Sequence, residues 1–296
     1  PPLPSWKNLS VIHRGLTWTS QVLLIRAEKK KGETGSAMAV GSQFGTVRTG
    51  LHRDSYTIVR KCNPKGLIFA NLSAFASVEQ AKAAIDMISA DALQIHLNPA
   101  QELAMEEGDR DFSNCLSHIE AMVQGVGVPV IVKETGCGMA KKEAQDLLDV
   151  GVTLLDIGGA GGTNFPAIEH QRYPEGNEEL SEWGIPTVLS LLSVVQTVGW
   201  GNGVIASGGI RSALDVVKAQ VLGASAVAMA GNLLQKIQQE GTEETIHFLQ
   251  RLLNKVLDFY TLLGCRTFRD LHEARYYLTG ETAQAVSWLR KYDQND

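Results

Sequence analysis

The sequence lacks the marks of a secreted, zinc-stabilised or membrane-spanning protein. Its four cysteines, Cys62, Cys115, Cys137 and Cys265, form no C-x-x-C pair. This spacing disfavours a structural zinc site or a disulfide framework and favours a reducing compartment. No apolar run approaches the roughly 20 residues that cross a bilayer, and no secretory signal is recognisable. We therefore expect a cytoplasmic globular protein.

An excess of positive charge is also missing. Lysine and arginine number 27 against 32 acidic residues, and the formal net charge is −5. A general nucleic-acid binder is therefore disfavoured, and an anionic ligand must be met by local positive groups. The 44% hydrophobic and 20% charged residues are ordinary for a globular chain and exclude disordered and fibrous classes. The 296 residues suit one (β/α)₈ barrel, which takes about 250, or two domains of roughly 150.

Short, almost continuous apolar runs alternate with amphipathic segments from about residue 36 onward. The runs cover residues 36–41, 66–71, 92–98, 128–133, 152–157, 203–207 and 226–230, with an eighth near 22–25. Such runs indicate strands buried on both faces, as in a parallel sheet. Helices are predicted to begin at Ser77, Lys141 and Ser212, the first with a capping-box pattern. We expect a single domain, residues 1–296, folded as a TIM (β/α)₈ barrel, with a doubly wound open sheet as the alternative.

Two further segments stand apart from this alternation. The stretch from Gly158 to Trp183 is polar, rich in glycine and long for a loop between a strand and a helix. We expect an extended loop around residues 158–184, which is a length that functional lids often have. From Thr242 to the end, the pattern predicts helices that close the barrel.

Small-residue turns follow the last two predicted strands. They read Ser207-Gly-Gly-Ile-Arg211 and Met229-Ala-Gly-Asn232. Each turn exposes backbone N–H groups and precedes a helix N-terminus, which favours an anion. Two such turns on the final strands of a barrel predict a phosphate site. The alternative for each turn is an ordinary tight connection.

Other predicted strand ends carry groups that suit a cofactor ring. Lys133 ends a fully apolar strand, where it is costly to bury unless it faces a ligand or partner; it could stabilise negative charge on a reduced flavin, or extend to the surface. Thr163 follows a glycine-rich turn and can donate to a phosphate or a ring edge, unless the turn is only structural. Ser42 and Asn71 add neutral hydrogen-bonding groups.

The predicted strand 92–98 has the most polar ending. His96 and Asn98 share one face, and Gln101 and Glu102 follow directly. A single carboxylate here suits Mg²⁺, which needs one or two carboxylates together with water and substrate phosphate oxygens. A solvated loop is the alternative. No Ser-His-Asp or Cys-His arrangement is legible; we expect Cys137 to be an unreactive thiol and His118 and His247 to be surface residues.

Together these motifs resemble the type 2 isopentenyl diphosphate isomerases, the flavin-dependent kind. The resemblance covers residues 35 to about 270, and the most specific parts are the 93–102 motif and the loop from Glu169-His-Gln-Arg172 to Trp183-Gly184. The remaining matching segments are 39–43, 66–71, 132–138, 156–165, 206–211 and 229–231. The segments 156–165, 206–211 and 229–231 also occur, loosely, in other FMN barrels.

The resemblance implies an enzyme that interconverts isopentenyl diphosphate and dimethylallyl diphosphate, without net redox change. It implies reduced FMN and Mg²⁺ as cofactors, NADPH as the reductant, and a homotetramer or homo-octamer. Gln101 would lie next to the migrating double bond, Glu102 would hold Mg²⁺, and His96 and Asn98 would contact the diphosphate. The residues implied to hold FMN are Ser42, Asn71, Lys133, Thr163, Gly209, Arg211, Ala230 and Gly231.

The N-terminal part departs from the family pattern. The family has an Arg-Lys…His segment and a flavin-contacting turn on its first strand, whereas Trp18-Thr-Ser-Gln-Val-Leu-Leu24 stands here. Missing segments or real divergence would both explain this. We interpret Lys29-Lys-Lys31 as a solvated helix face. Two other functions stay open: an FMN-dependent oxidoreductase of the 2-hydroxy-acid oxidase type, although the expected histidine base and arginine pair are missing, and a flavin-binding barrel without catalysis.

Overall fold

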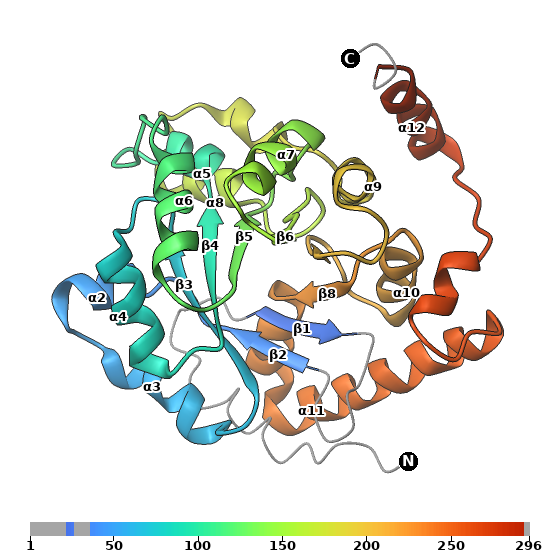
Figure 1. Ribbon diagram of the computed structural model, residues 1–296, viewed down its shortest axis with the longest axis horizontal. Helices are drawn as coiled ribbons and strands as arrows, with labels where there is room; N and C mark the ends of the chain where they lie inside the picture. The colour runs from blue at the N-terminus through green and yellow to red at the C-terminus, as the bar shows by residue number, and fades with distance from the viewer. Residues whose placement is uncertain (1–21, 27–35, 293–296) are drawn as a thin grey trace.

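Eight strands close into a barrel in the order of the chain and are surrounded by helices (Figure 1). The computed structural model describes residues 22–26 and 36–292. Its strands are β1 (Val22–Arg26), β2 (Ser36–Ala39), β3 (Leu67–Ser73), β4 (Ala92–Leu97), β5 (Val130–Glu134), β6 (Leu154–Asp156), β7 (Val204–Ala206) and β8 (Ala226–Met229). Each predicted apolar run overlaps one of them. From β2 to β8, every strand pairs in parallel with the next, so the predicted barrel is confirmed.

Strand β1 is the exception to the parallel pattern. It pairs antiparallel with both β2 and β8 and so closes the barrel. A strand was expected here, but an ordinary (β/α)₈ barrel would have it parallel to its neighbours. The short connection explains the difference: only residues 27–35 separate β1 from β2, and a parallel crossover needs a dozen or more residues. The predictions for Trp18–Gln21 and for Lys29–Lys31 lie outside the described residues.

Helices follow the strands, and the sequence signals at their starts explain where they begin. Ser77 and Ser212 each cap a helix through a capping box, in which the serine hydroxyl accepts from the backbone three residues on. The helices are α2 (Phe44–Thr49), α3 (Arg53–Cys62), α4 (Val78–Ile88), α5 (Pro99–Ala104), α6 (Cys115–Gly125), α7 (Lys141–Asp149), α8 (Phe165–Arg172), α9 (Thr187–Val198), α10 (Ala213–Val221), α11 (Gly231–Leu262) and α12 (Gly280–Tyr292). The three helices predicted near Ser77, Lys141 and Ser212 are confirmed.

The long connection after β6 is not a simple extended loop. It contains α8, capped by the Asn164 side chain, and a short 3₁₀ helix, η2 (Glu178–Glu182). Helix α8 packs against α5, which follows β4. Pro166 and Glu169 are the buried residues of α8. Their burial fixes this helix over the rim of the barrel, which is the edge formed by the carboxyl ends of the strands and the segments that follow them. The predicted loop at 158–184 is therefore corrected to a partly helical segment.

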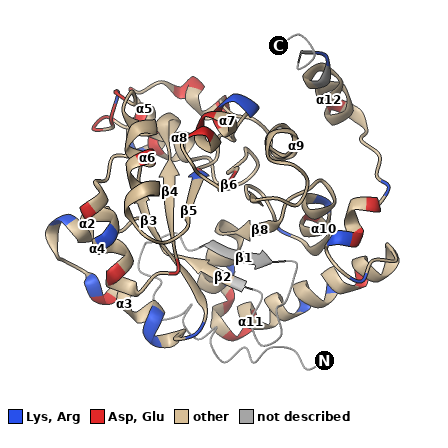
Figure 2. Ribbon diagram, viewed as in Figure 1, with Lys and Arg blue, Asp and Glu red and all other residues tan. Residues whose placement is uncertain are grey.

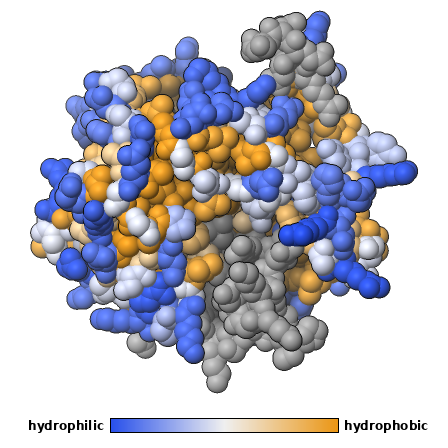
Figure 3. All heavy atoms as spheres, in the orientation of Figure 1, coloured by the Kyte–Doolittle hydropathy of each residue, from blue (hydrophilic) through white to orange (hydrophobic). Residues whose placement is uncertain are grey.

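The core has two parts. Inside the barrel lies a layer of small and branched residues, Ala37, Ala39, Ala92, Ile131, Ile205 and Ala228. A larger apolar cluster fills the space between the strands and the surrounding helices. Most charged residues lie on the helices and loops around the barrel, and few lie on the strands (Figure 2). In the view of Figure 3, apolar residues gather in the middle of the face and polar ones at its margin.

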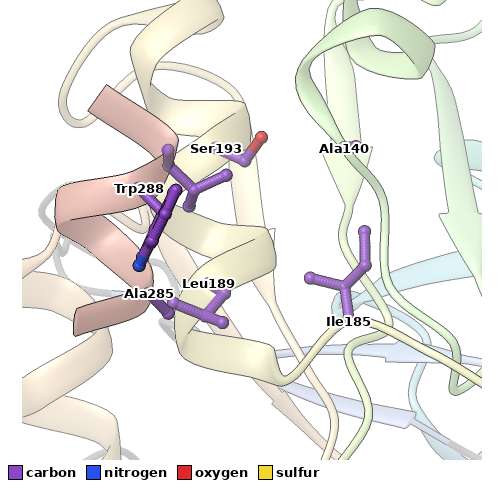
Figure 4. Close-up of a pocket in the computed structure, with 7 residues that line it drawn as sticks. Ala140, Ile185, Leu189, Ser193, Ala285 and Trp288 are labelled. Atoms are coloured by element: carbon purple, nitrogen blue, oxygen red, sulfur yellow. The ribbon is translucent and has the colours of Figure 1, made fainter. Parts of the chain in front are cut away.

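The C-terminal part is helical, as predicted. Helix α11 bends at Gly241, where the backbone is not helical, and packs against α10. Helix α12 lies against α9, and between them is a hollow of about 320 Å³ with mainly apolar walls (Figure 4). This hollow contains none of the predicted site residues. Among the helices of the described part, none combines the length and the apolar character that crossing a membrane requires.

Candidate active site

The interior of the barrel becomes polar toward the carboxyl ends of β3 to β7. Ala92 and Ile131 belong to the apolar layer inside the barrel, and Leu154 packs against it. Since alternate residues of a strand face the same side, the residues farther along, Gln94 and His96 on β4, Lys133 on β5 and Asp156 on β6, also face inward. The strand register places His96 beside Lys133 and Lys133 beside Asp156. These residues form the polar floor of the site.

On one side of this floor, amide side chains form a continuous network. Asn71 donates from Nδ2 to Gln94 Oε1 at 2.9 Å, and its Oδ1 lies 2.9 Å from His96 Nδ1. The buried Gln43 accepts from the Asn71 backbone N–H at 3.1 Å and donates to the backbone of α4. Gln94 Nε2 is buried and has no partner among the described residues. A buried donor without a partner is costly, so this group is available to a ligand.

His96 is neutral in this environment. Burial, followed by the nearby positive charge of Lys133, lowers the pKa of His96 to about 4. Because Asn71 Oδ1 accepts from Nδ1, Nε2 of the neutral ring is an acceptor. His96 can therefore donate to a phosphate oxygen only if the ring takes up a second proton.

On the other side of the floor, Lys133 faces a carboxylate. Its Nζ donates to the backbone oxygen of Glu134 at 2.6 Å and lies 3.9 Å from Asp156 Oδ2. Asp156 is fully buried, and its Oδ1 accepts from the Ser207 hydroxyl. The Lys133 side chain is 16% exposed, so it does not extend freely to the surface, which was the alternative considered for it.

Glycine turns from β6, β7 and β8 meet at the opposite side of the rim. Gly209 has a φ of +77°, and a Cβ there would lie 2.4 Å from the carbonyl oxygen of Gly161. A Cβ on Gly162 would lie 2.8 Å from the Gly209 backbone nitrogen, and one on Gly231 would lie 3.2 Å from Thr163 Oγ1. Only glycine permits this close approach of the β6 and β7 turns, whereas Gly231 approaches the Thr163 side chain.

These turns present hydrogen-bond donors. No described residue accepts from the backbone N–H groups of Gly209, Gly231 or Asn232, and the last two begin α11, where a helix N-terminus favours negative charge. Arg211 is exposed beside them, with its guanidinium 3.5 Å from the Gly161 carbonyl oxygen. The turns therefore fit the phosphate of a nucleotide cofactor such as FMN.

Above the floor, α5 and α8 bring polar side chains together. Gln101 donates from Nε2 to Glu169 Oε1 at 2.8 Å. Glu169 is 6% exposed and also pairs with Arg172. Asn98 donates to Glu102 Oε1 at 2.9 Å, and the backbone N–H of Asp109 donates to Glu102 Oε2 at 3.1 Å. Gln101 and Glu102 are thus held in fixed orientations at the rim.

A metal would find few protein ligands at this rim. Within the described ranges, no three His, Cys, Asp or Glu side chains gather as a metal site. Glu102 offers one carboxylate, and Mg²⁺ commonly binds one or two carboxylates together with substrate phosphate oxygens. The residues therefore fit a metal that arrives with a diphosphate, and they do not fit a metal held by protein ligands alone.

Glu134 is the last residue of β5, and Cys137 lies in the turn that follows. Glu134 Oε2 accepts from the backbone N–H groups of Gly136, Cys137 and Gly138 at 2.6–2.9 Å. Burial nonetheless raises the pKa of the Glu134 carboxyl to about 7. Burial, with the nearby Glu134, raises the pKa of the Cys137 thiol to about 11, which agrees with the expected unreactive thiol.

The predicted site residues occupy one end of the barrel, in three groups with Ser42 apart from them. His96 and Lys133 belong to the floor and Asn71 to the amide network beside it, whereas Asn98, Gln101 and Glu102 belong to the rim. Thr163, Gly209, Arg211, Ala230 and Gly231 form the glycine turns, and Ser42 lies after β2, where Tyr56 donates to its carbonyl oxygen at 2.6 Å. His118 and His247 are exposed, as expected, and the four cysteines are free thiols.

Several residues of the site were not predicted individually, among them Gln94, Glu134, Asp156 and Glu169. For Gln94 and Asp156 a signal was present, because a polar residue at an inward position of an apolar strand is unusual. Glu169 could not be found in this way, because its burial depends on how α8 packs over α5. Glu134 accepts only from its own turn, which the sequence does not reveal.

Sequence comparison places the chain among flavin enzymes. Residues 17–278 match the family described as FMN-dependent dehydrogenase. The isopentenyl-diphosphate delta-isomerase of Geobacillus sp. (strain WCH70) is 48% identical over 246 residues, which are 83% of this chain and 70% of that protein. The protein of the same name from Bacillus licheniformis is 46% identical over 258 residues, covering 87% and 73% of the two chains.

Solved structures share the fold at low sequence identity. Inosine 5′-monophosphate dehydrogenase from Legionella pneumophila has a TM-score of 0.57 at 15% identity, with 82% of this chain and 79% of that chain covered. A mandelate oxidase mutant with benzaldehyde has a TM-score of 0.55 at 18% identity, covering 76% and 66%. GMP reductase from Trypanosoma brucei has a TM-score of 0.54 at 20% identity over 75% of this chain, which spans about half (50%) of that structure.

Proposed function

The chain belongs to the FMN-dependent dehydrogenase family and, within it, to the type 2 isopentenyl-diphosphate isomerases, and from this premise we propose that it interconverts isopentenyl diphosphate and dimethylallyl diphosphate with reduced FMN and Mg²⁺. One observation carries the proposal. The glycine turns, the cationic floor at Lys133 and the rim pair Gln101–Glu169 all lie at the carboxyl end of one barrel, which is where barrel enzymes bind their ligands.

The glycine turns and the floor are suited to hold FMN between them. The free N–H groups at Gly209 and Gly231, with Thr163 and Arg211, would bind its phosphate. Ser42, Asn71 and the unpartnered Gln94 amide offer hydrogen bonds to ring edges, and Lys133 offers a positive charge. Such a charge favours a ring that carries negative charge after reduction.

The polar side chains of α5 at the rim, above the proposed FMN site, are suited to hold the diphosphate. Glu102 is fixed by Asn98 and by the Asp109 backbone N–H, so its remaining lone pairs can bind one Mg²⁺ shared with diphosphate oxygens. Asn98 would contact the same group. His96 lies on the floor with an acceptor Nε2, and contact with the diphosphate would draw a second proton onto its ring.

The isomerisation adds a proton at one carbon and removes one from another, with no net electron transfer. An alkene is a very weak base, and no strong general acid among the described residues faces the floor, since His96 is neutral. Reduced FMN supplies a group that can give and take a proton. The role of Gln101 is to orient the hydrocarbon part of the substrate, and Glu169 fixes the Gln101 amide through the 2.8 Å hydrogen bond.

This proposal implies that a reductant, with NADPH as the biological one, is needed only to prime the flavin. The purified protein, loaded with FMN, should be primed anaerobically with a known amount of reductant and then given isopentenyl diphosphate. We expect many product molecules per reductant consumed. Consumption of one reductant per product, or full activity with oxidised FMN, would instead indicate an oxidoreductase. Bound FMN without any turnover would indicate a flavin-binding barrel without catalysis. The homotetramer or homo-octamer implied by the resemblance is part of the same proposal.

A second test concerns the metal. Removing the charge of Glu102 with Glu102→Gln should raise the Mg²⁺ concentration needed for half-maximal activity by roughly tenfold or more, because a carboxylate ligand is lost. FMN affinity should stay unchanged. Glu106→Gln, at an exposed position just past the C-terminal end of α5, is the matched control. Unchanged Mg²⁺ dependence in Glu102→Gln would place the metal elsewhere.

A further inference from the structure

Asp156 is buried more completely than a carboxylate normally is. Its side chain is 0% exposed. Oδ1 accepts from the Ser207 hydroxyl and from the Gly158 backbone N–H at 3.3 Å. Oδ2 has no hydrogen-bond partner among the described residues. Half of the carboxylate is therefore desolvated without a donor, which costs free energy unless a charge compensates for it.

The compensating charge is that of Lys133. The two residues are direct neighbours in the register of β5 and β6, and Nζ lies 3.9 Å from Oδ2. An ammonium has three N–H groups, and the described residues accept one of them, at the Glu134 carbonyl oxygen. Two N–H groups thus remain for a ligand or for movement toward Asp156.

The other neighbours of Lys133 do not provide a close counter-charge on the floor. His96, on the opposite side in the register, is neutral. The Glu134 carboxylate accepts from its own turn, through Gly136, Cys137 and Gly138. Beyond Asp156 in the register lies Ile205, which is apolar. Asp156 is therefore the negative group on the floor that faces Nζ.

We infer that Asp156 is a positioning residue, which holds the Lys133 ammonium on the floor of the barrel so that its charge favours reduced over oxidised FMN. The inference rests on the proposed function, because Lys133 is assigned to FMN there. Asp156 acts through Lys133, and Ser207 fixes the carboxylate in turn. A buried ammonium without its counter-charge costs free energy. Loss of the Asp156 charge should therefore cause the Lys133 ammonium to move away from its position on the floor.

The test is the ratio of dissociation constants for oxidised and reduced FMN, measured by anaerobic titration of the purified protein. Lys133→Met should lower the preference for reduced FMN by roughly tenfold or more. Asp156→Asn should lower it by a similar factor, and Ser207→Ala by a smaller one. In a double-mutant cycle, Asp156→Asn should change the ratio no further once Lys133→Met is present.

Asp91→Asn is the matched control. Asp91 lies just before β4, at the opposite end of the strands, and pairs with Arg60 at 2.6 Å. This variant should lose stability and keep the ratio of the wild type. If Asp156→Asn does not fold, the double variant, which removes both charges together, and Ser207→Ala still provide the comparison.

The outcomes separate the inference from the proposed function. If Lys133→Met leaves the ratio unchanged, the assignment of Lys133 to FMN is wrong. If Lys133→Met lowers the ratio and neither Asp156→Asn nor Ser207→Ala does, Asp156 is not a positioning residue. Additive effects in the double variant would also overturn the inference, since Asp156 would then act independently of Lys133.

Discussion

On one side of the barrel mouth side chains face the site, and on the other side the backbone faces it. On the side of β3 to β6, side chains face the site: Asn71, Gln94, His96, Lys133 and Asp156. On the side of β7 and β8, the inward positions are apolar, as at Ile205, Ala226 and Ala228, and the turns that follow contain Gly209 and Gly231. There the backbone itself faces the site, because a Cβ at Gly209 would overlap the neighbouring turn.

The side chains are therefore suited to take part in the reaction, whereas the glycine turns are suited to bind the phosphate of the cofactor. Side chains differ in charge and can orient a reacting group, whereas backbone N–H groups and helix N-termini bind any phosphate in nearly the same way. We expect substitutions on the backbone side to affect retention of FMN. Substitutions on the side-chain side should affect turnover, pH dependence or the preference for reduced over oxidised FMN, without a general loss of FMN binding.

The largest effect is expected on the backbone side. Gly209→Ala places a Cβ only 2.4 Å from the Gly161 carbonyl oxygen, so the two turns must separate. We expect FMN affinity to fall by two to three orders of magnitude, about 3–4 kcal/mol, measured by flavin fluorescence titration.

The control for this variant separates a steric effect from backbone strain. Gly50 has nearly the same φ, +74°, and a Cβ added there would meet no atom within 4 Å. Gly50→Ala should therefore lose some stability and keep its flavin affinity. Equal affinity of Gly209→Ala and wild type would show that the glycine turns do not hold FMN.

On the side-chain side, Gln101→Ala should have the opposite effect, with lower turnover and unchanged FMN affinity. The variant loses the amide that Glu169 orients, and we expect turnover to fall roughly 100-fold, as for a misplaced substrate, with FMN affinity unchanged. Steady-state assays and flavin titration on the same samples measure both. Gln124→Ala, on the outer helix α6, is the matched control. A parallel loss of FMN in Gln101→Ala would remove the distinction between the two sides.

A smaller effect concerns pH. The pKa of Glu134 is raised to about 7 from an ordinary 4.5, so the folded protein holds this proton longer than the unfolded chain. Its contribution to stability is present below about pH 4.5 and is lost as the pH rises toward 7. Between about pH 5 and 6.5, wild type should lose about 2 kcal/mol of unfolding free energy relative to Glu134→Gln.

Chemical denaturation of both proteins at a series of pH values measures this difference. His96 contributes with the opposite sign, because its pKa is lowered to about 4, and its contribution is lost as the pH falls below about 6.5. Glu134→Gln should therefore show a steeper loss of stability toward acid than wild type. Parallel pH profiles for the two proteins would mean that Glu134 is ionised throughout this range.

The fold was predictable because its signals are local. Apolar runs predicted β2 to β8, and Ser77 and Ser212 predicted helix starts that the capping boxes confirm. The direction of β1 was not predictable from its apolar residues, because a strand pattern has no direction; the short segment 27–35 was the only clue. The 158–184 segment hid α8, because a helix that buries few residues has weak periodicity.

For the site, the sequence by itself determined which chemical groups stand at the strand ends: the glycine turns, Lys133, and the series His96, Asn98, Gln101 and Glu102. Each lies within a few residues of the strand that carries it, so local order is enough. Only the tertiary structure decided that Asp156 faces Lys133, that Gln101 is held by Glu169, and that His96 is neutral. These facts depend on strand register and on burial among distant segments, and the energy of a charge or a hydrogen bond is set by those surroundings.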